Sequence, residues 1–410
     1  MTGTTLVAVS TVQVVADPPA ERDEDLSPRE RLAWLLRHRY AALVAPALVF
    51  IAIRELGLFV LGLMADRWNK STTAALTSWD GQWFLGIAGG GYGGVPNSLV
   101  DAFGKRTPET PLAFFPGYPA LVRWLGGLPG VETRGAAFTV SLVSGVFCAY
   151  GLFRLGAKIR DGSPRAGLVL VALFAASPMA IVLSMTYSEA TFCALAAWAL
   201  VGVVERKWVL AGLCTAGAGL VRPTAAALLL AVGVAALVAV VTRKDGWKPW
   251  VGGLIAPLGL LGYLGYVAAR TGRVDGWFAL QQRGWDSRFD GGAATWKFAL
   301  ANLGEPRSVL ELTTVWILGI AVALVVLGFR RRLEWPLLVY GIGVLVMDLG
   351  SNGLMNSKAR LLLPAFTLLI PAALAIAKRR TSTAVALLSG LAVFSAWFGA
   401  YAITAWQYAI

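Results

Sequence analysis

The groups of this 410-residue chain that could do chemistry are carboxylates and guanidinium groups. His38 is the only histidine, and it lies in a basic segment before the first apolar run. Cys148, Cys193 and Cys214 lie inside long apolar runs, where we expect them to pack rather than to form disulfides or bind a metal ion. A general base, if the chain uses one, must therefore be an aspartate or a glutamate.

Asp80 is distinguished from the other acids by the sequence around it, SWDGQWFLGIA. Trp79, Trp83 and Ile87 are four residues apart, so a helix here carries one aromatic and apolar stripe. We expect this helix to lie flat on a membrane, with Ser78 as its cap and Asp80 in its first turn, where the helix dipole keeps a carboxylate ionised. A simple helix-start role for Asp80 explains the spacing equally well.

Other charged residues border the apolar runs. Glu189 begins one run directly after Tyr187 and Ser188, at a membrane boundary where an ionisable group is costly unless it is paired or functional. Arg222 and Arg360 also lie beside apolar runs, and each can grip a phosphate by forked hydrogen bonds. An ion pair between Glu189 and Arg222 is an equally good interpretation, and snorkelling arginines have the same pattern.

Two further places hold polar residues of interest. Arg54 and Glu55 fall inside the first apolar run, where charged residues usually indicate function, such as lining a cavity or contacting a lipid. For Glu55 we favour a structural pairing across helices. Much later in the chain, one segment offers the hydrogen-bonding and stacking groups that sugar sites use, in Gln281, Gln282, Arg283, Trp285 and Asp286.

The composition indicates which elements must position these residues. Hydrophobic residues make up 57% of the chain and charged residues only 14%, whereas about 25% of a water-soluble globular chain is charged. Together with 16 tryptophans, this composition excludes large soluble domains. We therefore expect an all-α, polytopic membrane protein.

Apolar runs suited to cross a bilayer, which takes about 20 residues, recur along the chain. We count about eleven, near 41–64, 135–153, 166–184, 190–204, 208–221, 224–241, 250–268, 309–329, 335–349, 361–377 and 383–405. Every second connection carries a basic cluster, at 158–165, 206–207, 243–248, 330–332 and 378–380. The positive-inside rule then places the amino terminus in the cytoplasm. The net charge of +13 reflects this topology, and we expect no nucleic-acid partner.

The spans divide the chain into two parts. We expect residues 1–40 to be a disordered, basic cytoplasmic segment and residues 41–410 to form the transmembrane domain. Two long outer loops, about 65–133 and 270–307, are rich in tryptophan, which prefers the membrane interface. Loops of this length are usually functional, and we expect interfacial helices in the first of them.

This topology narrows the candidate bases, because His38 lies on the inner side. The acids at the outer face or its edge are Asp66, Asp80, Asp101, Glu109, Glu132, Glu189, Asp275, Asp286, Asp290, Glu305, Glu311 and Asp348. Asp80 and Glu189 stand out among them by their context.

The same segments resemble PIG-V type mannosyltransferases, which add the second mannose to the glycosylphosphatidylinositol anchor. The first luminal loop of that family is similar to Trp79-Asp80-Gly81, Phe84, Ile87-Ala88, Gly91-Tyr92, Ala113-Phe114-Phe115-Pro116, Tyr118-Pro119 and Arg123. The resemblance continues in Ser177-Pro178, Tyr187-Ser188-Glu189, Arg222-Pro223 and, more loosely, Lys358-Ala359-Arg360 ahead of Pro364.

The resemblance implies a GT-C fold, that is, a multi-span glycosyltransferase that takes a sugar from a polyprenyl phosphate carrier. It implies that Asp80 is catalytic, and we expect Glu189 to assist it. We expect the donor phosphate to be bound by Arg222, Arg360 and Lys358. The expected substrate contacts are Trp79, Gln82, Tyr92, Arg123, Tyr187, Gln282 and Trp285.

We therefore expect an inverting mannosyltransferase of the plasma (inner) membrane, with its active site on the outer face. It would transfer mannose from polyprenyl-phosphate mannose to a lipid or glycan acceptor, and the composition is typical of a bacterial chain. This chemistry requires no metal ion, although a divalent cation can assist it. The alternatives are transfer of a different polyprenyl-phosphate sugar, transport or flipping of a lipid or solute, and a non-catalytic scaffold.

Overall fold

Helices make up the regular structure of the described part of the chain, which confirms the expected all-α fold. The computed structural model describes residues 39–410, with side chains from residue 43 onward. Apart from helices, these residues contain an isolated antiparallel bridge between Phe289 and Ser351. The predicted amino-terminal segment 1–40, with His38, falls almost wholly outside the described residues. Leu43–Ile410 form one compact unit.

The described helices match the predicted apolar runs. Five are long and apolar enough to cross a membrane: α2 (Arg39–Arg67), α6 (Thr133–Lys158), the continuous pair α11 (Lys248–Ile255) and α12 (Leu258–Thr271), α15 (Val309–Arg330) and α19 (Thr381–Thr404). A sixth candidate span is broken by a bend of 54° between Met355–Leu361, which contains α17 (Lys358–Leu361), and Leu363–Ala377, which ends in α18 (Ile370–Ala377).

Shorter apolar helices occupy the remaining runs. They are α7 (Pro164–Ala175), α8 (Glu189–Val204), α9 (Trp208–Gly219), α10 (Ala225–Val241) and α16 (Trp335–Gly350). The predicted run 166–184 is not one helix, because α7 ends at Ala175 and a 3-10 turn, η4 (Ala180–Ser184), follows.

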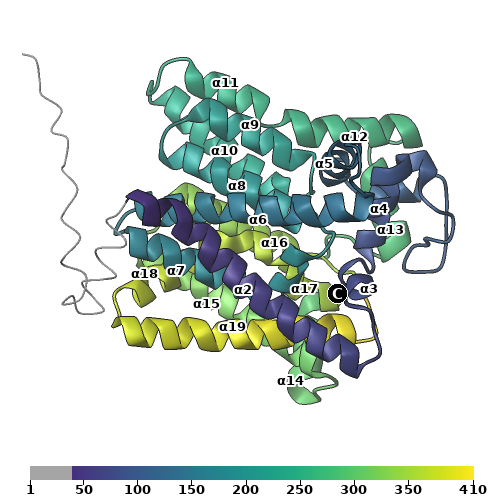
Figure 1. Cartoon of the computed structure of the whole chain (residues 1–410). Coiled ribbons are helices and arrows are strands. Elements are labelled where there is room, and N and C mark those ends of the chain that lie inside the picture. Colours follow the sequence, from purple (N-terminus) through teal and green to yellow (C-terminus); the bar gives the residue numbers. More distant parts are fainter. Residues whose placement is uncertain (1–38) are drawn as a thin grey trace, which may run out of the picture. The chain divides into compact units, whose positions relative to one another are not determined.

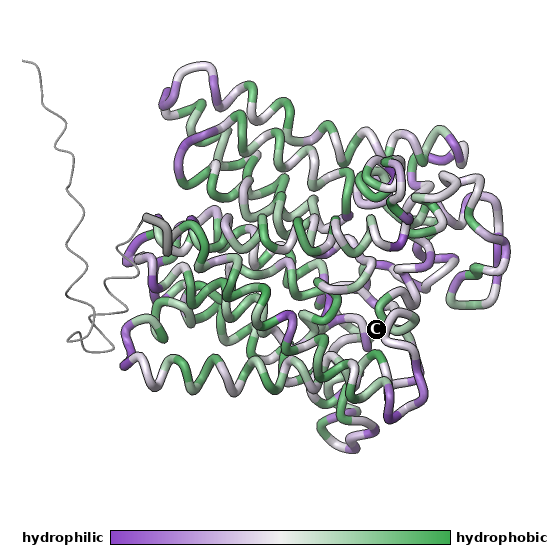
Figure 2. Tube along the Cα trace, in the orientation of Figure 1, coloured by the Kyte–Doolittle hydropathy of each residue, from purple (hydrophilic) through white to green (hydrophobic). Residues whose placement is uncertain are grey.

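The predicted basic loops lie together at one end of the helix bundle. They are linked through Arg154 to Glu205, Arg206 to Asp245, the Arg160 amide to Glu334, and Arg165 to the carbonyl oxygen of Arg379. Hydrophilic residues collect at both ends of the bundle, with apolar residues between them (Figure 2). The expectation that these connections share one side is thereby confirmed.

The two long loops form short helices at the opposite end (Figure 1). The first contains α3 (Thr72–Leu76), α4 (Asp80–Gly90), η2 (Tyr92–Gly94), η3 (Thr110–Ala113) and α5 (Gly117–Gly126), and the second contains α13 (Gly276–Trp285) and α14 (Ala293–Gly304). The expected helix around Asp80 is present, but Ser78 does not cap it. Trp79 occupies the cap position, and the Ser78 hydroxyl donates to the carbonyl oxygen of Ala75 at 2.7 Å.

Glycines allow α9 to pack with its backbone directly against α11 and α12. A Cβ atom added at Gly212 would lie 2.4 Å from the Gly252 carbonyl oxygen, and one added at Gly259 would lie 1.8 Å from that of Ala216. Such contacts between small residues are typical of membrane helices, whose association depends on close packing rather than on hydrophobic burial. These contacts fix the position of α12. Leu260 and Tyr263 of this helix then pack against residues of the two long loops.

We expect Gly259→Ala to destabilise the protein, because the new methyl group must push α9 and α12 apart. Overpacking of this kind costs about 1–3 kcal/mol, and the thermal unfolding midpoint in detergent should fall by several degrees. The matched control is Gly262→Ala on the same helix, where an added Cβ atom meets nothing within 4 Å. Equal midpoints for the two variants would contradict the packing described above.

Candidate active site

A cavity of about 630 Å³ lies at the end of the bundle formed by the long loops. This volume is in the range of small-molecule sites. Its aromatic walls are Trp79, Trp83, Phe84, Phe114, Phe115, Trp277, Phe278, Trp285 and Phe289. Its ionisable residues are Asp80, Asp101, Arg222, Arg288, Asp348, Lys358 and Arg360. The cavity therefore combines stacking surfaces with a small group of charges.

The local backbone places Asp80 at the edge of this cavity. Asp80 is the first residue of α4, and Trp79 before it has φ 51° and ψ −117°, a strained conformation for an aromatic residue. Such strain costs about 1–3 kcal/mol and is characteristic of functional sites. Gly81 allows α4 to come close to Thr186, since a Cβ atom there would lie 2.5 Å from the Thr186 hydroxyl oxygen.

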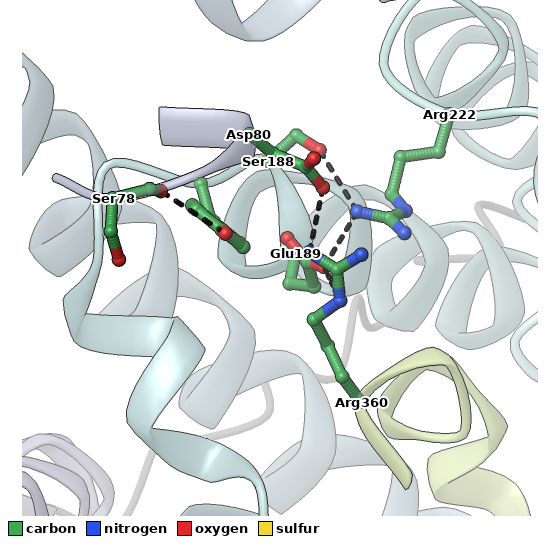
Figure 3. Close-up of polar contacts among 7 residues, drawn as sticks. Ser78, Asp80, Ser188, Glu189, Arg222 and Arg360 are labelled. Carbon is green, nitrogen blue, oxygen red and sulfur yellow. Dashed lines mark hydrogen bonds and ion pairs between the residues drawn. The ribbon is translucent and has the colours of Figure 1, made fainter. Parts of the chain in front are cut away.

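Two arginines join Asp80 to Glu189 (Figure 3). Arg360 donates from Nη1 to the Asp80 carboxylate at 2.7 Å, and its Nε lies 3.7 Å from Oε1 of Glu189. Arg222 pairs with the same Glu189 oxygen at 2.8 Å and donates to the Ser188 hydroxyl at 3.0 Å. The side chain of Asp80 is 30% exposed, whereas that of Glu189 is fully buried. Asp80 is therefore the accessible carboxylate of this charge network.

Both guanidinium groups keep unused donors. The buried Nε atoms of Arg222 and Arg360 have no hydrogen-bond partner among the described residues. The Arg360 guanidinium also lies over the Tyr187 ring, 5.2 Å from its centroid, and the Tyr187 hydroxyl donates to the Ser78 carbonyl oxygen at 3.3 Å. Since both arginines line the cavity, an incoming anion meets positive charge that is already held in place.

Lys358 provides a third buried cation on α17, two residues before Arg360. Its ammonium group donates to the carbonyl oxygens of Asp348 and Ser351. Since an ammonium group has three N–H donors, one remains for a ligand in the cavity.

Six of the twelve residues that we expected at the site line the cavity, among them all three that we expected to bind the donor phosphate. Asp80, Arg222, Arg360, Lys358, Trp79 and Trp285 line the cavity. Tyr187 lies behind Arg360 rather than on the cavity wall. Glu189 forms an ion pair with Arg222, which was one of the two interpretations that the sequence allowed. Its buried carboxylate is therefore used within the protein.

Other predicted contacts do not reach the cavity wall. Gln82 and Gln282 are exposed outside the lining. Arg123 donates to the carbonyl oxygens of Ala88 and Ile87, at 2.8 and 3.3 Å, and so binds the last turn of α4. Tyr92 donates to the Phe114 carbonyl oxygen at 2.9 Å. Burial raises the pKa of Tyr92 above its ordinary value, so its phenol is a donor and not a base.

Arg54, inside the first span, also has a structural role. It is buried and donates to the Ser184 hydroxyl at 3.1 Å and to the Ala175 carbonyl oxygen at 2.9 Å. It thereby binds the chain where α7 ends. Glu55 is exposed on the surface of α2, and no described ion pair includes it, so the predicted pairing across helices is not seen.

Of the two neighbouring glutamines that the sequence suggested, only Gln281 lines the cavity, and it donates to the Ala113 carbonyl oxygen at 3.1 Å. Sequence reasoning assigned no role in the site to other residues of the wall. Trp277 and Phe278 of α13 are also part of the wall. Among residues 43–410, no group of three or more His, Cys, Asp or Glu side chains is placed to hold a metal ion.

Comparison with known proteins supports the fold. No family model and no curated protein sequence matches the chain. A solved structure of ArnT from Cupriavidus metallidurans bound to undecaprenyl phosphate is similar, with 14% identity, a TM-score of 0.50, and coverage of 87% of this chain and 75% of ArnT. ArnT in the apo state gives 13% identity, a TM-score of 0.49, and coverage of 79% and 72%. The chain thus has the GT-C fold of a polytopic membrane protein.

We expect Glu189→Ala to destabilise the protein, because Arg222 and Arg360 would lose the buried carboxylate between them. Breaking a buried ion pair costs about 3–5 kcal/mol, so the thermal unfolding midpoint in detergent should fall by several degrees. The matched control is Asp275→Asn, which removes an exposed pair with Arg273 and should leave the midpoint unchanged. A midpoint of Glu189→Ala equal to that of the control would show that the buried network does not stabilise the fold.

Proposed function

We propose that this chain is an inverting glycosyltransferase of the membrane that uses a polyprenyl-phosphate sugar as donor. The observation that carries the proposal is the network in which Arg360 and Arg222 join Asp80 to Glu189 at an aromatic cavity. This site lies at one end of a bundle of membrane helices, where a lipid-linked substrate can enter from the bilayer. ArnT, whose fold the chain shares, has been solved with undecaprenyl phosphate bound.

The donor phosphate would bind between the arginines and Lys358. Arg222, Lys358 and Arg360 all line the cavity, and their cationic groups can donate hydrogen bonds to phosphate oxygens. A phosphate bound to Arg360 would compete with Asp80 for this guanidinium. Donor binding would thus loosen the 2.7 Å pair and make the Asp80 carboxylate a better proton acceptor.

In the transfer step, the acceptor hydroxyl would attack the anomeric carbon of the sugar. Asp80 takes the hydroxyl proton while the new C–O bond forms. The bond between the anomeric carbon and the phosphate oxygen breaks, and its electron pair leaves with the polyprenyl phosphate. The cations stabilise the negative charge of this leaving group. Because attack and departure occur on opposite faces, a single displacement inverts the anomeric configuration.

Glu189 has a different role from Asp80 in this mechanism. It is fully buried and contacts both arginines, so it has no access to an acceptor hydroxyl. We assign it the positioning of Arg222 and Arg360. Its place at the first residue of α8 suits this role, since the helix dipole stabilises a carboxylate there.

For the sugar, the membrane and the orientation, the support comes from the sequence. The resemblance to PIG-V type enzymes supports mannose as the sugar, and a different polyprenyl-phosphate sugar is the alternative. The basic loops at the far end of the bundle support an active site on the outer face of the plasma membrane. The acceptor would then be an outward-facing lipid or glycan. A transporter would instead place its site near the bilayer midplane.

We expect Asp80→Asn to reduce mannose transfer from polyprenyl-phosphate mannose by about 10²–10⁴-fold, the usual contribution of a general base. Asparagine has nearly the same shape and still accepts a hydrogen bond from Arg360, so the protein should remain folded. The measurement is transfer of radiolabelled mannose to a membrane extract by purified protein. Asp66→Asn, at the exposed end of α2, is the matched control and should keep wild-type activity.

Full transfer by Asp80→Asn would refute the assignment of the base. Activity of the wild-type protein with another polyprenyl-phosphate sugar, but not with mannose, would keep the mechanism and change the donor.

A further inference from the structure

Asp348 is a buried carboxylate that the mechanism above does not use. The residue is only 4% exposed, and neither oxygen of its carboxylate has a hydrogen-bond partner among the described residues. Burying an unpaired carboxylate is unfavourable, and such a group in a native structure usually has a reason. It therefore requires an explanation.

The position of Asp348 on α16 indicates that it faces the cavity. Val344, Met347 and Asp348 line the cavity, together with Ser351 just after the helix ends. The spacing i, i+3, i+4, i+7 places these residues on one face of a helix. The carboxylate of Asp348 thus belongs to the face of α16 that borders the ligand space.

Lys358 does not neutralise this carboxylate by a direct contact. Its ammonium group binds the main-chain carbonyl oxygens of Asp348 and Ser351 instead. These bonds attach the end of α16 to α17, and both carboxylate oxygens remain buried without a hydrogen-bond partner among the described residues. Asp348 thus differs from Asp80 and Glu189, each of which contacts an arginine.

A ligand that contacts the Asp348 carboxylate must do so with hydrogen-bond donors, because an ionised carboxylate only accepts. A phosphate offers only acceptors and would be repelled, whereas neighbouring hydroxyl groups of a sugar can donate to the two oxygens of one carboxylate. The cavity walls supply aromatic faces for the apolar side of such a ring. We propose that Asp348 accepts hydrogen bonds from hydroxyl groups of the transferred sugar and positions it for attack.

This inference rests on the proposed function, and it divides the donor between two parts of the site. Arg222 and Arg360 bind the phosphate, and Asp348 binds the sugar attached to it. The two parts meet at α17. Lys358 on this turn donates to the main-chain carbonyl oxygen of Asp348, and Arg360 pairs with Asp80. Asp348 is thereby a residue that determines which sugar is accepted.

The test compares two ligands, undecaprenyl phosphate with mannose attached and undecaprenyl phosphate alone. Their affinities are measured for purified protein in detergent, for example from the ligand-induced change in intrinsic tryptophan fluorescence. We expect Asp348→Ala to weaken binding of the sugar-bearing lipid by about 10–100-fold, the usual effect of losing hydrogen bonds to a charged group. Its affinity for undecaprenyl phosphate should equal that of the wild-type protein.

Two further variants make the result specific. Arg222→Gln should weaken binding of both lipids, because it removes a phosphate contact. Asp290→Asn changes an acid outside the cavity lining, whose oxygens accept main-chain N–H groups of Gly292 and Ala294, and should change neither affinity. In the kinetic assay, Asp348→Asn should raise KM for the donor and also lower kcat, since a loosely held sugar is poorly aligned.

Thermal unfolding separates a binding role from a structural role. Because the Asp348 carboxylate has no partner to lose, Asp348→Ala should leave the midpoint unchanged or raise it. A lowered midpoint, with equal losses of affinity for both lipids, would overturn the inference, and so would unchanged affinity for the sugar-bearing lipid. If the wild-type protein binds neither lipid, the proposed function itself fails.

Discussion

The arrangement of the site depends on two pairs of opposite charges, Asp80 with Arg360 and Glu189 with Arg222, in which every partner except Asp80 is largely buried. Removing these groups from water is costly, and only mutual pairing offsets the cost. The partners come from α4, α8, α17 and the connection between α9 and α10, which are far apart in the sequence. The requirement for charge pairing therefore holds four segments around one cavity. In these pairs the Nε atoms of Arg222 and Arg360 have no hydrogen-bond partner among the described residues. The two arginines thus stabilise the fold and also present positive charge to an anion in the cavity.

The helices around this network position it by close packing rather than by a large hydrophobic driving force. Glycines at the contacts of α9 with α11 and α12 bring main chains together, and the adjoining end of α12 contributes to the aromatic region near Phe115. The short helices of the first long loop are fixed in turn by Arg123 and Tyr92, which bind carbonyl oxygens at the end of α4 and at Phe114. A mobile loop would place Asp80 poorly. This loop is instead bonded to its neighbours at several points.

The apolar helices, and the grouping of the basic loops at one end of the bundle, could be predicted from the sequence because apolar length and charge are local properties. Asp80 could be found for a similar reason, since its neighbours form a distinctive segment. The roles of Arg123 and Tyr92 could not, because main-chain carbonyl oxygens carry no sequence signal. The sequence suggested Gln281 and Gln282 together and could not distinguish them, although a shift of one residue turns a side chain by about 100° around a helix and only Gln281 lines the cavity. Asp348 was only one acid among twelve until its missing partners could be seen.

The bend of 54° in the broken segment has a mechanical consequence. It isolates a turn of only four residues, α17, which carries both Lys358 and Arg360. The two cations lie two residues apart and hold different segments: Lys358 binds the end of α16, and Arg360 binds Asp80 at the start of α4. A single short turn thus joins two walls of the cavity that come from distant parts of the chain.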